Sequence, residues 1–280
     1  MPKAILLLSG GLDSMLVGKI LQNQGVEVLP VSFKSFFFGC DSAEKVASSF
    51  GLKLRVVDFS EEHLRLFKNP KNGRGKGFNA CPDCHMLMIE KAKEIMEKEK
   101  YDFLATGEVL NERPFSQNKR IFELVEKKLG LEGLILRPLS AKLLPETIPE
   151  QKGWVKREDL FGISGKVRKP QIALAKELGV TEFPSPGGGC IATDVIYGKK
   201  LITLLKIIPD FDGNDAILLR NGRMFWDNKV LIIVGRDEKD NEQILKLKKD
   251  KDIAFEPDNF SGPTVLIRGF GKEIPEEVII

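Results

Sequence analysis

Two stretches of the sequence carry residues whose types and spacing could do chemistry. The first, residues 9–14, reads SGGLDS and follows a short apolar run. Two successive glycines permit positive φ and let the backbone approach a ligand closely. Their amides, with the free N–H groups of a helix that begins after them, form a concavity that favours anions. We therefore predict a nucleotide phosphate site in which Ser9, Gly10, Gly11 and Ser14 donate hydrogen bonds.

Asp13 is the acidic residue of this loop, and its charge would repel a phosphate. We expect Asp13 to organise the loop or to meet a metal ion. The stretch lacks the Lys-Ser/Thr ending of a Walker A loop and does not match G-x-G-x-x-G, so neither ordinary P-loop nor Rossmann dinucleotide chemistry is expected. The alternative interpretation is a Gly-Gly turn in which Asp13 only caps a helix.

The second stretch is a C-x-x-C pair, Cys81 and Cys84, followed by His85. Positions i and i+3 on a helix place both sulfurs on one side, and a third cysteine, Cys190, follows three glycines. This set suits a dithiol relay that passes on a persulfide sulfur, three-cysteine ligation of a 4Fe–4S cluster, or a zinc site that includes His85. The alternative is a pair of small buried residues, and Cys40 is expected to be structural.

The length and composition limit the classes of protein to which this chain can belong. The 280 residues have a formal net charge of +3, with 42% hydrophobic and 30% charged residues, which suits one large domain or a domain with a smaller neighbour. This balance does not by itself indicate a nucleic-acid binder. Because no apolar run approaches the roughly 18 residues of a membrane span, and no signal peptide is recognised, we expect a cytoplasmic protein without membrane contact or a disulfide framework.

The first hundred residues alternate between apolar strands and helically spaced segments. The expected strands are 4–8, 26–33, 54–59 and 102–107, and the expected helices are 15–24, 42–50 and 84–100. This alternation predicts an α/β fold with a parallel sheet covered on both faces. Ligands of such sheets bind beyond the carboxyl ends of the strands, where the SGGLDS, SFKSF and ATG stretches fall.

Farther along, the character of the sequence changes near residue 197. Helices are expected at 118–130 and 169–179; after the change, short strands are expected at 216–220, 224–226, 229–235, 252–255 and 264–269, with a helix at 237–249. This α+β composition predicts a first domain of residues 1–196 and a smaller second domain of residues 197–280.

The SGGLDS loop resembles the PP-loop of the N-type ATP pyrophosphatase superfamily, which includes GMP synthetase and the tRNA thiolation enzymes. The resemblance implies an adenine nucleotide alpha hydrolase-like domain that uses ATP and Mg²⁺, transfers AMP to a substrate oxygen and releases pyrophosphate. In this family the end of the second strand and a glycine on the fourth contact adenosine. By position these residues are Ser32, Phe33, Thr106 and Gly107.

The cysteines resemble those of the tRNA 2-thiouridylases and their iron–sulfur relatives, in which one cysteine after the third strand and one in a later loop meet above the PP-loop. The persulfide-type thiouridylases usually use only one of the first two cysteines. Because this chain has Cys81, Cys84 and Cys190, we favour ligation of a 4Fe–4S cluster by all three over a simple relay. With Asp13, these cysteines are the expected catalytic residues.

Basic and polar residues gather in three places where we expect phosphate-backbone contacts, against the alternative of ordinary solvated charge. They are Lys68, Lys71, Arg74 and Lys76; Arg113, Gln117 and Arg120; and Arg220, Arg223 and Arg236. The stretches RPFSQ and LRPLSAKLLPET resemble a subfamily of thiolation enzymes whose small C-terminal domain looks like the RNA-binding module of NFACT proteins.

The resemblance implies an ATP-dependent tRNA sulfurtransferase that adenylates a uridine carbonyl and replaces its oxygen with sulfur. The expected partners are tRNA, a sulfur donor (a cysteine desulfurase, a carrier or inorganic sulfide) and a second copy in a homodimer. In the 4-thiouridine synthetases, ferredoxin-like and THUMP regions precede the PP-loop, which here begins at residue 9. We therefore expect tRNA recognition from the second domain, the loops or a partner protein.

Two other functions fit the same motifs. One is a PP-loop ATP pyrophosphatase that acts on a small molecule, by amidation or nitrile formation, with Cys81, Cys84 and His85 holding structural Zn²⁺. The other is a nucleotide-regulated RNA-binding protein without turnover.

Overall fold

The computed structural model describes residues 1–183 and 189–278. The chain divides into two compact units. The first contains Met1–Phe59 and Ala80–Gly189, and the second contains Ser60–Asn79 and Cys190–Ile280. This division into compact units does not test which parts of the chain fold independently. The domain boundary after residue 196 therefore stays a prediction.

The first unit is a parallel sheet with helices on both faces. Its strands are β1 (Lys3–Leu7), β2 (Glu27–Lys34), β3 (Arg55–Asp58), β4 (Phe103–Thr106) and β5 (Ile135–Leu136), in the spatial order β3-β2-β1-β4-β5. Its helices are α1 (Leu12–Asn23), α2 (Asp41–Ser49), α4 (Cys81–Glu99), α5 (Lys119–Leu129), α6 (Ile148–Gln151) and α7 (Lys169–Glu177). All the strand pairs are parallel, which confirms the predicted α/β class.

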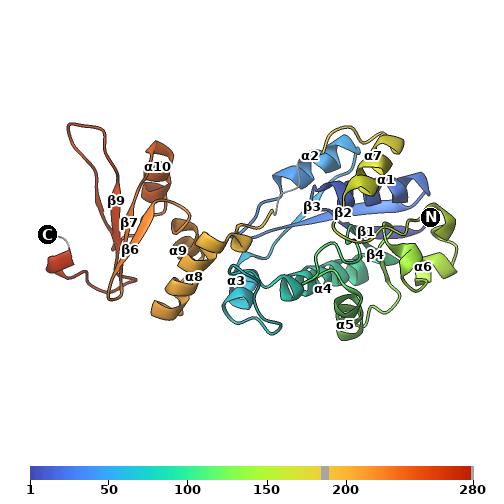
Figure 1. The fold of residues 1–280 in the computed structure, drawn as a ribbon, viewed down its shortest axis with the longest axis horizontal. Helices are drawn as coiled ribbons and strands as arrows, with labels where there is room; N and C mark the ends of the chain where they lie inside the picture. The colour runs from blue at the N-terminus through green and yellow to red at the C-terminus, as the bar shows by residue number, and fades with distance from the viewer. Residues whose placement is uncertain (184–188, 279–280) are drawn as a thin grey trace. The chain divides into compact units, whose positions relative to one another are not determined.

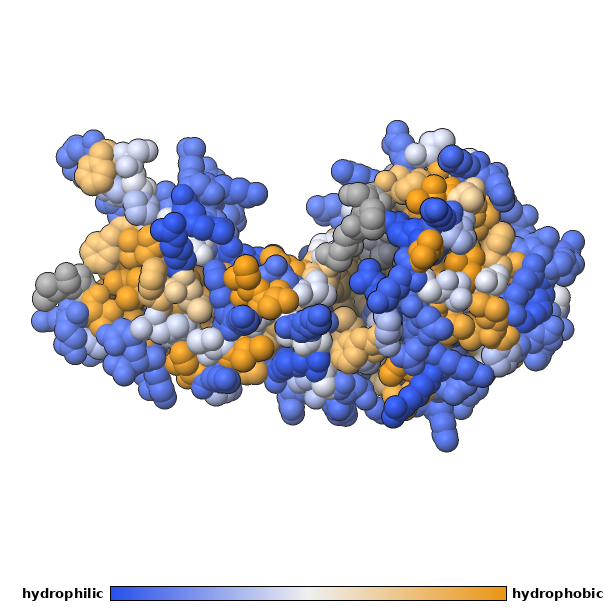
Figure 2. Space-filling view, in the orientation of Figure 1, coloured by the Kyte–Doolittle hydropathy of each residue, from blue (hydrophilic) through white to orange (hydrophobic). Residues whose placement is uncertain are grey.

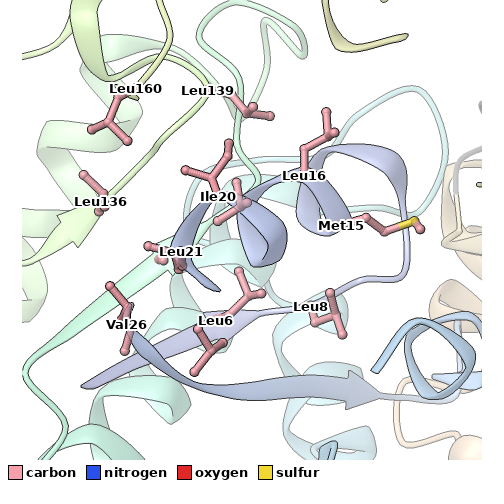
Figure 3. Close-up of a cluster of buried hydrophobic side chains, with 14 of the residues drawn as sticks. Leu6, Leu8, Met15, Leu16, Ile20, Leu21, Val26, Leu136, Leu139 and Leu160 are labelled. Carbon is pink, nitrogen blue, oxygen red and sulfur yellow. The ribbon is translucent and has the colours of Figure 1, made fainter. Parts of the chain in front are cut away.

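Helices cover both faces of this sheet, as the near-continuous apolar strands require. Figure 1 shows α1, α2 and α7 on one face and α4 and α5 on the other. Leu6 of β1 and Leu16 and Leu21 of α1 are all 0% exposed, and they meet in the cluster of side chains drawn in Figure 3. Burial of each such leucine contributes about 1.5–3 kcal/mol, so β1 and α1 form a firm base for the loop between them.

The strand order reverses its direction between β1 and β4. From β1 the chain runs outward to β2 and β3, and then returns to β4 on the other side of β1. Such a reversal is a topological switch point, where open α/β sheets bind their ligands. The SGGLDS loop follows β1, and Gly107 directly follows β4.

The second unit combines helices with a small antiparallel sheet. Its strands are β6 (Arg223–Asp227), β7 (Val230–Val234), β8 (Ile253–Phe255) and β9 (Val265–Arg268), in the order β6-β7-β9-β8. Its helices are α3 (Ser60–Lys68), α8 (Val195–Ile207), α9 (Gly213–Leu218) and α10 (Glu238–Lys246). Among the described residues, none of the helices combines the length and apolar character that crossing a membrane requires.

The segment Ser60–Asn79 belongs to this second unit, although the sequence placed it in the first domain. The N–H of Phe78 donates to the carbonyl of Ala192 at 2.9 Å. A Cβ at Gly77 would lie 2.4 Å from that same carbonyl oxygen, so glycine is needed for the close approach. These long-range contacts have no local signature in the sequence.

The expected strand at 216–220 is wrong, because most of it lies in α9. The side chain of Asp212 accepts from the N–H of Asp215 at 3.0 Å, and the side chain of Asp215 accepts from the N–H of Asp212 at 2.9 Å. This reciprocal capping box starts a helix. A short apolar run alone does not distinguish a strand from a buried helix, and α8 escaped the sequence analysis for the same reason.

Candidate nucleotide site and the cysteines

The SGGLDS loop closes on itself at the carboxyl end of β1. Ser14 Oγ donates to the Gly11 carbonyl at 2.9 Å and lies 3.2 Å from Ser9 Oγ. The Gly11 N–H donates to Ser9 Oγ at 3.3 Å. Gly11 is the N-cap residue of α1 and provides no side-chain cap, so the first amides of the helix lack an intrahelical acceptor. This geometry suits an anion at the start of α1.

Two glycines let other backbone segments approach the loop. Gly10 has a φ of +78°, and a Cβ there would lie 2.4 Å from the carbonyl carbon of Ser42, in α2. Gly107 follows β4, and a Cβ there would lie 2.6 Å from the nitrogen of Ser14. A side chain at either position would push the loop away from its neighbours. The structure thus brings Gly10 against the backbone of Ser42, and Gly107 against the backbone of Ser14.

Asp13 lies among groups that the sequence analysis did not assign to it. Burial raises the pKa of Asp13, while the positive charges of Arg168 and Arg113 act to lower this pKa. Asp13 Oδ1 is buried and has no hydrogen-bond partner among the described residues. Gln171 is 0% exposed, and neither of its amide atoms reaches a partner in that same part of the chain. Orphaned buried polar atoms of this kind point to a missing ligand.

Glu112 completes this charged cluster. Burial raises its pKa, as does Asp13, while Arg113 and Arg168 act to lower it. Carboxylate oxygens are the ligands that Mg²⁺ prefers, and arginine matches phosphate geometry. The residues therefore fit a magnesium–nucleotide complex. Glu112, Arg168 and Gln171 had no motif of their own that could have singled them out.

The four residues expected near adenosine have different surroundings. Ser32 and Phe33 lie near the carboxyl end of β2 and are 4% and 5% exposed. The ring of Phe33 packs on Phe59, with centroids 5.4 Å apart. Thr106 ends β4, and its hydroxyl donates to Glu108 Oε2 at 3.1 Å. Adenosine contact by these residues stays a prediction, and Gly107 has the most direct contact with the loop.

Glu108 ties the end of β4 to the C-x-x-C helix. Its Oε1 lies 3.0 Å from His85 Nδ1, and its Oε2 accepts from Arg137 Nε at 3.1 Å. Although burial acts to raise the pKa of Glu108, Arg137 and His85 hold it at about 2. The network fixes His85, the neighbour of Cys84, beside the strand end that contacts the SGGLDS loop. Sequence analysis missed Glu108 and Arg137 because their partners are distant in the chain.

Cys81 and Cys84 open α4 as expected, one turn apart, with Pro82 in the first turn. Cys84 is 7% exposed, and its N–H donates to the Ala80 carbonyl at 2.9 Å. Cys190 belongs to the second unit. Most of the glycine-rich turn expected before it, residues 184–188, lies outside the described residues.

Cys40 differs from the other cysteines in its surroundings. It is 8% exposed, and its thiol donates to Glu44 Oε1 at 3.3 Å. Burial raises the pKa of this thiol, and Glu44 adds to the effect. A thiol held protonated in this way suits a structural role.

A metal centre is not assembled within the part of the chain that the structure describes. There, no group of three or more His, Cys, Asp or Glu side chains could hold a metal ion. Cys81 and Cys84 would supply two ligands of a 4Fe–4S cluster or of Zn²⁺, but the third expected ligand, Cys190, is in the other unit. Both metal assignments stay predictions.

Some of the residues expected to contact RNA have structural roles instead. Arg74 donates to the carbonyls of Lys68 and Phe78 at 2.9 and 3.2 Å, and Lys68 donates to the carbonyl of Phe211. Gln117 is only 7% exposed. The exposed members of the expected set are Lys71, Lys76, Arg113, Arg120, Arg223 and Arg236, of which Arg236 is paired with Asp240.

The fold and the loop together define an α/β protein that carries a PP-loop-like sequence at the switch point of its sheet. The family described as "Thiamine biosynthesis protein (ThiI)" matches residues 1–142. This match covers half of the sequence, and the chain belongs to that family. The family described as "NFACT protein RNA binding domain" matches residues 222–278, in agreement with the resemblance noted for the second domain.

Curated relatives carry names from tRNA modification. "tRNA-specific 2-thiouridylase MnmA" of Helicobacter hepaticus (strain ATCC 51449 / 3B1) is 28% identical over 244 residues, 81% of this chain and 65% of that protein. "tRNA-specific 2-thiouridylase MnmA" of Karelsulcia muelleri (strain GWSS) is 29% identical over 133 residues, 42% of this chain and 34% of that protein. "Probable tRNA sulfurtransferase" of Thermoanaerobacter sp. (strain X514) is 30% identical over 125 residues, 39% of this chain and 30% of that protein.

The chain therefore spans between about a third and two thirds of the length of these relatives. Among solved structures, "Crystal structure of a 4-thiouridine synthetase - RNA complex with bound ATP" matches 77% of this chain and 53% of that chain. Its sequence identity is 23% and its TM-score is 0.46.

Proposed function

We propose that this chain is an ATP-dependent tRNA sulfurtransferase, which adenylates a uridine carbonyl oxygen and then replaces that oxygen with sulfur. The observation that carries the proposal is the SGGLDS loop at the switch point, where Gly107 meets the backbone of Ser14. Membership of the ThiI family and the names of the relatives support the same reaction class. A cytoplasmic location fits this role.

The first step forms a bond between the uridine carbonyl oxygen and the α-phosphorus of ATP, and pyrophosphate leaves. The amides of Gly10 and Gly11 and the hydroxyls of Ser9 and Ser14 bind the departing pyrophosphate. Donors oriented before the reaction stabilise the charge as it develops, without reorganisation. Because a carbonyl oxygen is a poor leaving group, this step must precede sulfur attack.

In this proposal Asp13 and Glu112 are the carboxylates that would hold Mg²⁺. When bound, this ion neutralises charge on the phosphate oxygens. Arg113 and Arg168 act electrostatically on Asp13 and Glu112, and they balance the remaining charge of the triphosphate.

In the second step a sulfur nucleophile attacks the activated carbon and AMP leaves with the former carbonyl oxygen. From hydrosulfide, loss of a proton completes the thiocarbonyl. From a persulfide on Cys190, attack by a second cysteine breaks the S–S bond and forms a disulfide, which an external thiol reduces. A cysteine desulfurase, a carrier or inorganic sulfide supplies the sulfur.

His85 follows Cys84 in the chain and is the residue that we assign to proton transfer in this step. The contact of its Nδ1 with Glu108 orients the ring and uses one ring nitrogen, which leaves Nε2 for this role. Residues 222–278, which match the NFACT RNA-binding family, supply tRNA contacts in this proposal.

The test is mass spectrometry of nucleosides from the tRNA of a strain that lacks this protein. The proposal predicts that one thionucleoside disappears and returns when the wild-type chain is supplied. A chain carrying Asp13→Asn does not restore it. If every thionucleoside persists at its normal level in the deletion strain, the assignment to tRNA is wrong.

A further inference from the structure

The sheet of the second unit has an open edge at β6. In the order β6-β7-β9-β8, β6 is a terminal strand. A two-residue turn, Asn228-Lys229, joins β6 to β7 and places Asp227 opposite Val230. Asn228 has a φ of +47°, as such tight hairpin turns require.

The hairpin determines which peptide groups of β6 face outward. The closing pair of a two-residue hairpin, here Asp227 and Val230, is hydrogen-bonded, and bonded pairs then alternate along the strands. The peptide groups of the odd-numbered residues of β6 therefore face β7. Those of Met224 and Trp226 face the outer edge, where no strand is paired among the described residues. An edge of this kind is a template for another strand.

The side chains on the exposed face of β6 have a symmetric arrangement. Phe225, at the centre of the strand, is 52% exposed. Arg223 lies two residues before it and Asp227 two residues after it, and both are exposed. Charges alone would protect an edge strand from pairing, but a central exposed phenylalanine works against protection. Figure 2 shows hydrophobic surface gathered over the strands of this sheet.

We propose that β6 pairs with β6 of a second copy of this chain, antiparallel and centred on Phe225. The twofold axis then places Phe225 beside Phe225 of the other copy. It also forms two equivalent pairs, in each of which Arg223 of one copy lies opposite Asp227 of the other. Met224 falls opposite Trp226, and these are the residues whose peptide groups face outward. The register therefore forms a regular antiparallel ladder with opposite charges and aromatic rings matched across the strands.

Charge complementarity favours a second copy over RNA at this edge. Asp227 would repel a phosphate backbone, whereas it attracts Arg223 of a second copy. The other edge strand, β8, is shorter and has Ile253 and Phe255 without flanking charges of opposite sign on the same face. The inference does not depend on the proposed catalytic function, since it rests on β6 alone.

The test begins with sedimentation equilibrium of the full chain between about 2 and about 200 µM, a range in which a small interface is measurable. We expect a reversible monomer–dimer equilibrium. Phe225→Lys weakens the dimer by at least about tenfold, and thermal melting confirms that the variant is folded. The matched control is Phe255→Lys, which replaces a phenylalanine that is 44% exposed on β8 and leaves the dimer unchanged.

A charge-swap cycle tests the register. Arg223→Asp and Asp227→Arg each place like charges opposite one another, so each weakens the dimer by about tenfold. The double variant restores opposite charges and recovers the dimer. A monomer at every concentration, or a double variant that does not recover, overturns the proposal. A monomer whose tRNA affinity falls with Phe225→Lys also overturns it and makes β6 an RNA surface.

Discussion

At the residue scale, the nucleotide loop depends on the absence of a side chain at Gly10. Gly10→Ala must accommodate both a φ of +78° and a Cβ 2.4 Å from backbone of Ser42. We expect ATP binding, measured by isothermal titration calorimetry, to weaken by at least about tenfold.

Gly25 provides the matched control for this substitution. Its φ is +73°, but nothing lies within 4 Å of a Cβ there. Gly25→Ala should cost about 1–2 kcal/mol of stability through the strained φ alone and leave ATP binding intact. Equal losses of ATP binding in the two variants would contradict the close approach of Ser42 as the cause.

Asp13 should be needed for activity although its charge destabilises the fold. Because burial raises its pKa in the folded protein, the folded state binds the proton more tightly than the unfolded chain does. The destabilisation therefore begins as pH rises through the pKa of this carboxyl in the unfolded chain, about 3.9. It is complete above the pKa of the carboxyl in the folded protein. Urea unfolding should find Asp13→Asn more stable than wild type at pH 7, with the difference shrinking toward pH 4.

The same variant should release no pyrophosphate with ATP and tRNA. Activity that survives in Asp13→Asn would rule out this carboxylate as a required metal ligand, and a stability difference that is independent of pH would contradict its raised pKa.

At the element scale, Glu108 joins the end of β4 to α4 through His85 and to β5 through Arg137. The pKa of Glu108 is lowered to about 2 in the folded protein, from 4.5 in the unfolded chain. Ionised Glu108 therefore stabilises the fold in full at pH values above 4.5. This contribution is lost as pH falls from 4.5 toward 2. Glu108→Gln should reduce the free energy of unfolding by about 3 kcal/mol at pH 7, and by less at lower pH.

Glu126→Gln is the control for that measurement. Glu126 pairs with the same Arg137, but its side chain is 20% exposed against 10% for Glu108. We expect a loss of about 1 kcal/mol. If Glu126→Gln lowers the free energy of unfolding as much as Glu108→Gln does, the loss comes from the ion pair with Arg137 and not from the contact of Glu108 with His85.

Most elements of the first unit could be predicted from the sequence, because hydrophobic periodicity and turn residues agree there, but β5 and α6 were missed. Apolar strands and glycine-terminated helices alternate with short connections, so the parallel sheet and the place of the SGGLDS loop follow from local pattern. The contacts that shape the site are different. Glu108 and Arg137 are 29 residues apart, and Gln171 is polar yet fully buried. Nothing in their neighbouring residues distinguishes them from surface positions.

At the scale of the whole molecule, the first unit contains Cys40, Cys81 and Cys84, and the second contains Cys190. Cys81→Ser, Cys84→Ser and Cys190→Ser should each abolish thiolation while ATP binding is retained, because none of these cysteines belongs to the SGGLDS loop. Cys40→Ser should keep thiolation, since Cys40 is buried against Glu44. Thionucleoside mass spectrometry and titration calorimetry measure the two properties. Full thiolation by Cys190→Ser would remove that residue from the reaction.

The grouping of Ser60–Asn79 with the second unit is a feature that only the folded chain reveals. Sequence analysis read the chain in order and assigned this segment to the domain around it. Its attachment depends on backbone approaches such as that of Gly77 to Ala192, which arise between segments more than a hundred residues apart. The consequence is that the segment just before Cys81 and the segment that begins with Cys190 share one unit.

The central claim is that a nucleotide bound at the SGGLDS loop is cleaved between its α and β phosphates to activate tRNA for sulfur. The most direct measurement uses ATP labelled at the α-phosphate, unmodified tRNA and sulfide, with products separated by chromatography. The account predicts labelled AMP in equal amount to the thiouridine formed, and neither product with Asp13→Asn. Labelled ADP in place of AMP, or AMP formation that does not require tRNA, would contradict it.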